Sequence, residues 1–229
     1  MSELRVLFEG EGLLAVDKPA GMLVIPGRAE GSGPSLREVL EERLGRKVYV
    51  VHRLDRDTSG VVVFALEPER HRALSMAFES GRVRKRYLAL VEGRLETPRM
   101  VEAALAPARK GRMRVARPGE EGKPSRTRVR PVELFAGASL VEAEPLTWRT
   151  HPIRVHLLSV GHTLLVDHQY GRAEPLKAPG GEVLLARTPL HAARLEWPAL
   201  PGVEARVVES PLPEDLAKTV EYLRQAPSP

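Results

Sequence analysis

The chain of 229 residues lacks cysteine and is poor in aromatic residues and in long apolar runs. Without cysteine it can form neither a disulfide framework nor a reactive thiolate, so a cytoplasmic location is expected. The longest apolar run, residues 61–66, is far too short to cross a bilayer, and the sequence does not open with a leader-type segment. We therefore expect no membrane partner. Aromatic residues make up only 4% of the chain, which argues against a broad platform for stacking RNA bases.

Charge is distributed unevenly along the chain. The net charge is +5, from 35 Lys and Arg against 30 Asp and Glu. Between Arg82 and Arg130 there are 15 basic and 5 acidic residues, a local charge of +10, which leaves −5 on the remainder. A concentrated basic stretch is the electrostatic footprint of a polyanion partner, although a solvated basic surface would give the same count.

Hydrophobic periodicity predicts short strands and four helices. The first helix begins with a capping-box pattern, Ser35 and Glu38, and stops at Gly45. Strands outnumber helices, and several connections are too short for crossover helices, so we expect an α+β domain with a mixed, mostly antiparallel sheet. One domain is expected over residues 1–225, with a tail at 226–229. Strands are predicted near residues 5–9, 13–17, 48–51, 61–66, 87–91 and 139–143, and helices over residues 36–44, 68–81, 150–161 and 213–223.

The most informative segment is HRLDRDTSG, from His52 to Gly60, between two predicted buried strands. The carboxylate of Asp55 would emerge from a rigid strand into a polar turn, which fixes its direction. Arg53 and Arg56 flank it, and nearby positive charge favours the ionised form. An ionised carboxylate is suited to act as a nucleophile or a general base rather than as a general acid.

Two other interpretations fit part of this segment. The spacing Asp-x-Asp-x-Ser-Gly that begins at Asp55 imitates the first half of a calcium-binding loop. The glutamate that should close such a loop falls at Leu66, and a β-branched run replaces the exiting helix, so calcium binding is not expected. The segment could also be a hydrogen-bonded Asx turn with a purely structural role.

The segment resembles the signature of the RluA-type pseudouridine synthases, and other parts of the chain resemble further segments of that family in the same order. The resemblance covers nearly the whole chain. It implies the pseudouridine synthase fold with a central active-site cleft, and an enzyme that isomerises a specific uridine in structured ribosomal or transfer RNA to pseudouridine. The other segments are DKPAGMLVIPG (17–27), KRYLALVEG (85–93), RTHPIRVHLLSVGH (149–162), VDHQYG (166–171), PLHAARLEW (189–197) and PLPEDL (211–216).

The resemblance implies a role for four individual residues. Asp55 matches the catalytic aspartate, Tyr87 the tyrosine that packs against the target base, and Arg154 the basic residue that pairs with the catalytic carboxylate. Arg53 matches the residue that occupies the space left by the flipped base. Taken singly, Tyr87 could be a half-buried strand residue, Arg154 a surface arginine and Arg53 part of a structural salt bridge. Whether Asp55 attacks the uridine or removes a ribose proton is left open by the sequence.

RNA is the expected partner, and the resemblance implies no cofactor, no metal and no protein partner. Because the first motif begins by Asp17, we expect no accessory RNA-binding domain before the catalytic one, and basic residues of the catalytic domain would select the target. Such residues contact phosphates and give affinity without sequence information. The RNA-binding candidates are Arg53, Arg56, Lys85, Arg86, Arg109, Arg112, Arg114, Lys123 and Arg126.

Two positions depart from the family pattern. Trp148 stands where glycine is usual, and Pro152 stands where glutamine is usual. Proline fits the first turn of a helix, where its missing N–H is not needed, but the side chain of glutamine is not there to contact the nucleotide. Trp148 would fill space beside the cleft or offer a stacking surface. Neither change removes a residue to which the resemblance gives a role in the reaction.

Two other functions remain open at this point. A catalytically silent RNA-binding protein could use the same cleft. A metal-dependent hydrolase could use the clustered histidines, although their spacing matches no standard zinc site. The residues that such a hydrolase would use are His151, His156, His162, His168 and Asp167.

Overall fold

The computed structural model describes residues 4–27, 33–147 and 149–225. The chain forms two compact units: unit 1 comprises Met1–Lys85 and Ala192–Pro211, and unit 2 comprises Arg86–His191 and Leu212–Pro229. Trp148 and the tail at 226–229 lie outside the described residues, and the single domain expected over residues 1–225 stays a prediction.

Unit 1 is built on strands in the order β1-β2-β4-β13. The pairings β1–β2, β2–β4, β3–β4 and β13–β14 are antiparallel. Side chains of Leu13–Val16 on β2 and Val61–Ala65 on β4 are at most 1% exposed, so both faces of these strands are covered. The strands are β1 (Val6–Gly10), β2 (Leu13–Lys18), β3 (Tyr49–Val50), β4 (Ser59–Ala65), β13 (Leu190–Trp197, in this unit from Ala192) and β14 (Arg206–Glu209).

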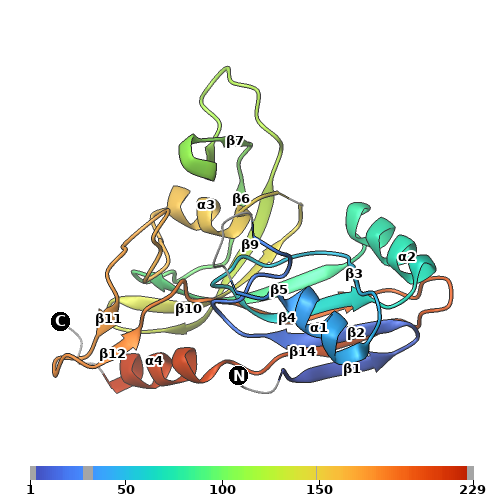
Figure 1. The fold of residues 1–229 in the computed structure, drawn as a ribbon. Coiled ribbons are helices and arrows are strands. Elements are labelled where there is room, and N and C mark those ends of the chain that lie inside the picture. Colours follow the sequence, from blue (N-terminus) through green and yellow to red (C-terminus); the bar gives the residue numbers. More distant parts are fainter. Residues whose placement is uncertain (1–3, 28–32, 148, 226–229) are drawn as a thin grey trace. The chain divides into compact units, whose positions relative to one another are not determined.

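Two helices complete unit 1, and both match the prediction (Figure 1). Helix α1 (Leu36–Leu44) begins with the predicted capping box, in which the backbone N–H of Ser35 donates to Glu38 Oε2 at 2.8 Å. It ends at Gly45, whose φ of 63° is left-handed. Helix α2 (Pro68–Glu79) has proline in its first turn and packs against β3 and β4. The apolar face of α2 is made by Leu74, Ala77 and Phe78.

Unit 2 contains a second set of strands in the order β5-β10-β9-β6, all paired antiparallel. Helix α3 (Pro152–Ser159) packs against β9 and β10. Helix α4 (Glu214–Gln225) contributes Leu216 and Val220 to a core cluster that also contains Leu90 and Leu140. The strands are β5 (Arg84–Glu92, in this unit from Arg86), β6 (Arg99–Glu102), β9 (Arg126–Leu134) and β10 (Ala138–Pro145), with a small hairpin of β11 (Leu176–Lys177) and β12 (Val183–Leu185) beside α4.

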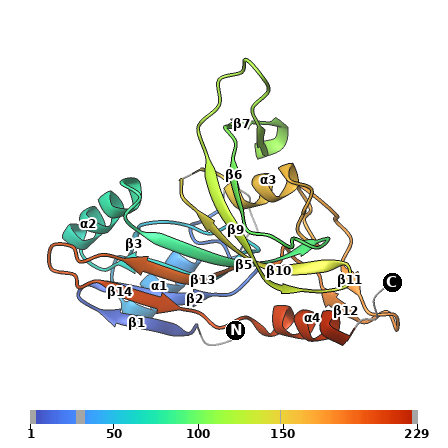
Figure 2. The same cartoon turned by 180° about the vertical axis from the view of Figure 1, so that it is seen from behind.

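A hairpin extends away from β6 and β9 in unit 2 (Figures 1 and 2). It consists of β7 (Leu105–Pro107), the 3-10 turn η1 (Arg109–Gly111) and β8 (Met113–Val115), followed by a returning loop. Two reciprocal backbone hydrogen bonds of 2.9 Å between Leu105 and Lys123 close its base. We call residues 105–123 the basic arm.

The predicted fold class is confirmed: the described residues form a mixed sheet with four α-helices. The strand predicted at residues 48–51 is present but spans only Tyr49–Val50. The expectation that this strand is buried is wrong, because both residues are partly exposed. Strand β9 was missed, although it alternates buried Thr127 and Val129 with exposed arginines. That period of two, typical of a strand with one buried face, is present in the sequence.

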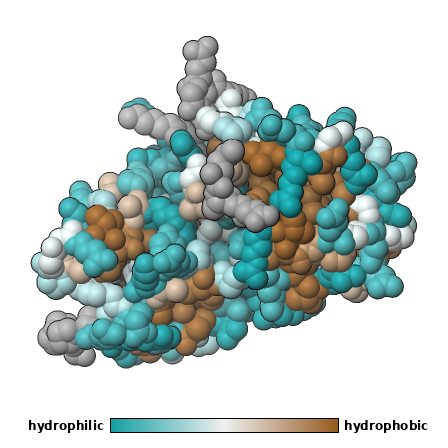
Figure 3. Space-filling model, turned by 60° about the horizontal axis from the view of Figure 1, so that its bottom comes forward, coloured by the Kyte–Doolittle hydropathy of each residue, from teal (hydrophilic) through white to brown (hydrophobic). Residues whose placement is uncertain are grey.

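Some large apolar residues are exposed in each unit. They include Val6 on β1 (38%) and Val207 on β14 (43%) in unit 1, and Val183 on β12 (51%) in unit 2. Figure 3 shows hydrophobic patches with hydrophilic side chains lying across and between them. Partly exposed apolar residues of this kind are ordinary at protein surfaces. No helix among the described residues is long and apolar enough to cross a membrane.

Gly60, at the start of β4, is constrained in two ways. Its φ is 111°, and a Cβ at this position would lie only 2.7 Å from the backbone nitrogen of Ala192 on β13. We expect Gly60→Ala to lower the free energy of unfolding by at least about 3 kcal/mol, because backbone strain adds to a forced separation of the strands. Urea denaturation measures this loss.

Gly45→Ala is the matched control for Gly60→Ala. Gly45 also has a positive φ, 63°, but no atom lies within 4 Å of a Cβ built there. The control should lose only about 1 kcal/mol, the cost of the left-handed conformation alone. Equal losses in the two variants would contradict a close approach between β4 and β13.

Candidate active site

Asp55 lies in a turn that leads into β4. The backbone N–H of Thr58 donates to the carbonyl oxygen of Asp55 at 3.2 Å and closes the turn. The neighbouring side chains of Leu54 and Thr58 are 6% and 2% exposed, whereas Asp55 is partly exposed and Arg53 is exposed. The turn predicted from the sequence is therefore present, with Asp55 held between buried anchors. Its catalytic role stays a prediction.

A buried lysine ties this turn to the first motif. Lys18, the last residue of β2, has 0% exposure. A buried ammonium group must satisfy its donors within the protein. Lys18 donates to main-chain carbonyls in the loop that follows β2 and in the turn that carries Asp55. The acceptors are the oxygens of Pro19, Met22 and Arg56, at 2.8, 2.7 and 2.9 Å. Lys18 thereby fixes the loop at residues 19–22 to the turn that carries Asp55.

Arg56 takes part in the same network. Its Nε donates to the carbonyl oxygen of Gly21 at 3.0 Å, and its own carbonyl oxygen accepts the N–H of Gly21 at 2.9 Å. Arg56 thus has a structural role that was not foreseen. The RNA contact predicted for Arg56 stays a prediction.

His52 anchors the beginning of the segment against the buried strand β4. It is 8% exposed, its Nε2 accepts the backbone N–H of Val63 at 3.1 Å, and its ring stacks on Phe78 with centroids 4.7 Å apart. Burial, together with the positive charge of Lys85, lowers the pKa of His52 well below its usual value. The neutral ring is the form that can accept the bond from Val63.

Lys85 lies beside this cluster, with its Nζ 5.9 Å from the ring centroid of Phe78. The residue is partly exposed, yet the enclosure of its ammonium lowers the pKa of Lys85 to about 7. A lysine that is only partly charged at neutral pH is a weaker phosphate ligand than a surface lysine. The environment therefore gives little support to the RNA contact predicted for Lys85, which stays a prediction.

In unit 2, Arg154 forms a buried bidentate ion pair with Asp167. Arg154 is 7% exposed and Asp167 1%, and their Nε–Oδ2 and Nη2–Oδ1 distances are 2.8 and 2.6 Å. Burial raises the pKa of Asp167, but the hydrogen bonds and charge of Arg154 outweigh this, so the net pKa of Asp167 is lowered. The alternative of a surface arginine is wrong. The predicted pairing of Arg154 with Asp55 stays a prediction.

Tyr87 lies on β5 opposite Ala143 of β10 and is 6% exposed. The alternative interpretation required a half-buried side chain. Tyr87 is instead buried. Its predicted role against the target base is not decided by this placement.

The histidines of the hydrolase alternative are used in separate contacts. His156, with 0% exposure, has its Nδ1 2.7 Å from Thr127 Oγ1. His151 has its Nδ1 2.8 Å from the hydroxyl of Tyr170. Within the described part of the chain, no group of three or more His, Asp or Glu residues is arranged to hold a metal ion. The geometry therefore does not support a metal-dependent hydrolase.

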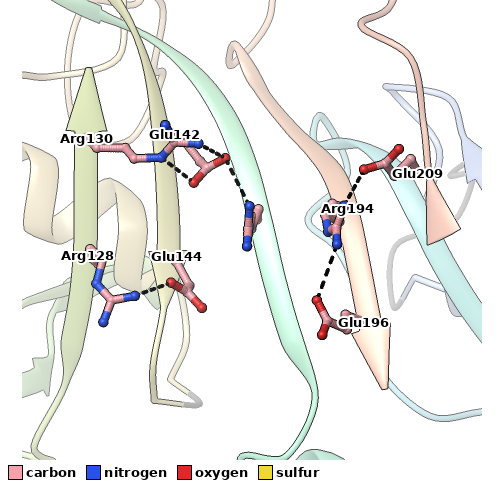
Figure 4. Close-up of polar contacts among 8 residues, drawn as sticks. Arg128, Arg130, Glu142, Glu144, Arg194, Glu196 and Glu209 are labelled. Carbon is pink, nitrogen blue, oxygen red and sulfur yellow. Dashed lines mark hydrogen bonds and ion pairs between the residues drawn. The ribbon is translucent and has the colours of Figure 1, made fainter. Parts of the chain in front are cut away.

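Several arginines of the basic stretch are neutralised by glutamates from neighbouring strands. Figure 4 shows Arg128 and Arg130 on β9 pointing toward Glu144 and Glu142 on β10, at 2.8 and 2.7 Å. Each arginine is the direct cross-strand partner of its glutamate. The local charge counted along the sequence is thus partly cancelled by residues outside the counted window. Glu142 also lies 4.0 Å from Arg86, whereas Arg126 pairs at 3.0 Å with Glu102, which the count along the sequence already includes. On β13 of unit 1, Arg194 pairs with Glu209 and Glu196 (Figure 4).

The basic arm keeps most of its predicted charge available. Arg109, Arg112 and Lys123 are exposed, and none of them forms an ion pair with another described residue. Arg114 differs, because it is held by Glu120 through two hydrogen bonds of 2.6 Å. The arm, rather than the whole basic stretch, is therefore the surface best suited to a polyanion.

Comparison with known proteins identifies the family. A family model described as RNA pseudouridylate synthase matches residues 12–159. This chain belongs to the RNA pseudouridylate synthase family. It is 38% identical over 231 residues to ribosomal large subunit pseudouridine synthase D of Nitrosomonas europaea, covering 98% of this chain and 66% of that protein. It is 37% identical over 229 residues to ribosomal large subunit pseudouridine synthase C of Escherichia coli K12, covering 96% of this chain and 70% of that protein.

Solved structures agree with this family assignment. Human RNA pseudouridylate synthase domain containing 1 superposes with a TM-score of 0.75 at 27% identity, over 99% of this chain and 97% of that one. Human RNA pseudouridylate synthase domain containing 4 gives a TM-score of 0.76 at 23% identity, over 96% and 93%, which shows the shared fold. The resemblance to pseudouridine synthases predicted from the sequence is confirmed.

The lowered pKa of His52 makes stability in this family member depend on pH. At a pH between the pKa of His52 in the folded chain and its pKa in the unfolded chain, the imidazole is protonated in the unfolded chain and neutral in the folded one. The free energy of unfolding therefore falls as the pH drops below about 6.5. His52→Gln keeps an acceptor for Val63 but cannot titrate. Below pH 6.5 we expect wild type to lose up to about 1.4 kcal/mol per pH unit relative to His52→Gln.

Urea denaturation of both proteins between pH 5 and pH 7.5 measures this difference. His156, whose pKa is also lowered, mainly by burial, is present in both proteins and cancels. Parallel stability profiles would show that His52 is not held neutral in the folded state.

Proposed function

We propose that this protein converts a uridine of large-subunit ribosomal RNA to pseudouridine, with Asp55 as the group that acts on the nucleoside. The observation that carries this proposal is the partly exposed Asp55, in a turn fixed by the buried ammonium of Lys18. Two relatives that are named as synthases of the ribosomal large subunit favour ribosomal over transfer RNA. The same relatives support action in the cytoplasm.

The reaction is an isomerisation, so it needs neither a redox partner nor an energy source. The bond between N1 of the base and C1′ of the ribose breaks, the base rotates, and a bond forms between C5 and C1′. The proton on C5 leaves, and N1 ends with a proton. Asp55 either attacks the nucleoside or removes a ribose proton, and Tyr87 assists the loss of the C5 proton. The family resemblance gives Arg154 the task of orienting the carboxylate of Asp55.

The target base must leave its stack before this chemistry can take place, which costs a few kcal/mol. Arg53 is exposed and lies two residues before Asp55. It forms no ion pair with the residues that the structure describes, which removes the salt-bridge alternative within that part of the chain. A planar guanidinium can stack on bases and donate several hydrogen bonds, so Arg53 is suited to fill the vacated space.

The basic arm supplies contacts to the RNA backbone. Three of its exposed cations, Arg109, Arg112 and Lys123, have no carboxylate partner in the described chain, so phosphate binding to them breaks no existing ion pair. Phosphate contacts give affinity and salt dependence but no sequence information. The paired arginines on β9 would first have to give up their glutamates.

Asp55→Ala should lower pseudouridine formation at least about a thousandfold, because the attacking or proton-accepting oxygen is removed, while RNA binding is largely kept. Pseudouridine in an unmodified transcript of bacterial large-subunit ribosomal RNA is the measurement. Asp57→Ala is the matched control, since Asp57 is also partly exposed in the same turn, and it should stay within about threefold of wild type. An inactive wild-type protein that still binds RNA would instead favour the silent RNA-binding protein.

Replacing Arg109, Arg112 and Lys123 by alanine should weaken RNA binding and reduce the slope of log affinity against log salt by about 1 for each phosphate that the protein no longer neutralises. Binding of the same transcript at several salt concentrations measures both effects. The charge-matched control replaces Arg46, Lys177 and Lys218, which are exposed elsewhere, and should leave the slope nearly unchanged. Equal effects of the two triple variants would show that only net charge matters.

A further inference from the structure

Tyr170 contacts both the basic arm and the start of helix α3, two parts of unit 2 that are distant in sequence. Its hydroxyl accepts the backbone N–H of Met113 at 2.8 Å and lies 2.8 Å from Nδ1 of His151. Its ring lies under the guanidinium of Arg154, with Cζ 4.7 Å from the ring centroid. Met113 begins β8 of the basic arm and His151 is the N-cap of α3. One side chain therefore joins the arm, the start of α3 and the arginine that α3 carries.

The planar guanidinium of Arg154 is contacted at its edge by a carboxylate as well as on its face by the ring of Tyr170. Asp167 binds the edge of the guanidinium through Nε and Nη2. Asp167 is itself fixed, because its Oδ1 accepts the backbone N–H groups of Gln169 and Tyr170 at 2.9 and 3.0 Å. The turn from Asp167 to Tyr170 thus presents both supports of Arg154. A displacement of Tyr170 would move both of them together.

The start of α3 also depends on Tyr170. His151 has φ 50° and ψ 37° and makes no side-chain hydrogen bond to cap the helix. The left-handed conformation is uncommon for a residue other than glycine and persists only when its surroundings hold it. The bond to the Tyr170 hydroxyl and an edge-on ring contact, with centroids 5.6 Å apart, help to hold His151 in this conformation.

We propose that Tyr170 is a positioning residue that couples the basic arm to the guanidinium of Arg154. RNA bound by the arm fixes β8, the Met113 hydrogen bond fixes Tyr170, and Tyr170 then fixes the face of Arg154. The inference rests on the proposed function, in which the arm binds RNA and Arg154 orients Asp55. It adds that binding of the RNA backbone and the chemical step are linked through one hydroxyl group.

A double-mutant cycle tests this link. Tyr170→Phe removes both hydrogen bonds but keeps the ring under Arg154, and it should lower kcat up to about tenfold with KM within about twofold of wild type. The arm variant, Arg109→Ala with Arg112→Ala, should raise KM and also lower kcat. When the two are combined, kcat should fall no further than in Tyr170→Phe alone. Kinetics use the unmodified large-subunit ribosomal RNA transcript.

A merely structural role for Tyr170 predicts a different result, namely kcat effects that multiply in the combined variant. Multiplying effects with an active wild type would overturn the coupling and leave the proposed function standing. A wild-type protein that forms no pseudouridine would overturn the proposed function and the coupling with it. The two failures are therefore distinguishable in one set of measurements.

His151→Asn is the matched control that tests whether the coupling passes through the Met113–Tyr170 hydrogen bond or through the contact between His151 and Tyr170. Asparagine tolerates the left-handed conformation, and the change removes the imidazole while the Met113 bond to Tyr170 remains. In this background the arm variant should still lower kcat. Disappearance of its effect there would overturn the route through Met113.

Hydrogen exchange of the wild-type protein gives a test that needs no variant. Addition of the transcript should slow exchange of the Met113 amide and of the Gln169 and Tyr170 amides together, because all three are joined through Tyr170 and Asp167. Protection confined to the arm would overturn the proposal.

Discussion

The buried ammonium of Lys18 is the interaction on which the geometry around Asp55 depends. A charge that is withdrawn from water must be matched by acceptors inside the protein, and Lys18 finds three main-chain carbonyl oxygens. One of them belongs to Arg56, the residue that follows Asp55. The cost of leaving the ammonium unsatisfied therefore stabilises the backbone of the turn that carries Asp55.

The same principle organises unit 2 around a different charge. Arg154 is buried and is matched by Asp167, whose carboxylate is in turn held by two backbone N–H groups. Breaking such a pair from one side would leave an uncompensated buried charge, so each partner keeps the other in place. Tyr170 adds a face-on contact and extends the arrangement to the basic arm. The guanidinium of Arg154 is thus held with little freedom to reorient.

Charge counted along the sequence and charge presented at the surface differ for a clear reason. Antiparallel pairing places Arg128 and Arg130 directly opposite Glu144 and Glu142, and opposite charges in such positions attract. The glutamates lie on β10, so a count that stops at Arg130 misses them. Among the described strands, β7 and β8 of the arm pair with each other and with no third strand. The arm therefore carries exposed cations that can bind phosphate.

The sequence by itself determined the family, the α+β class, the four helices and the turn around Asp55, because local periodicity, capping residues and motif spacing act over short distances. Only the tertiary structure decided the partners of the charges. The bonds from Lys18 to Arg56, from Arg154 to Asp167 and from Tyr170 to Met113 join residues that are distant in sequence. Burial made the bonds of Lys18 and Arg154 necessary, since a charged group that loses water must find its partner wherever the fold places one.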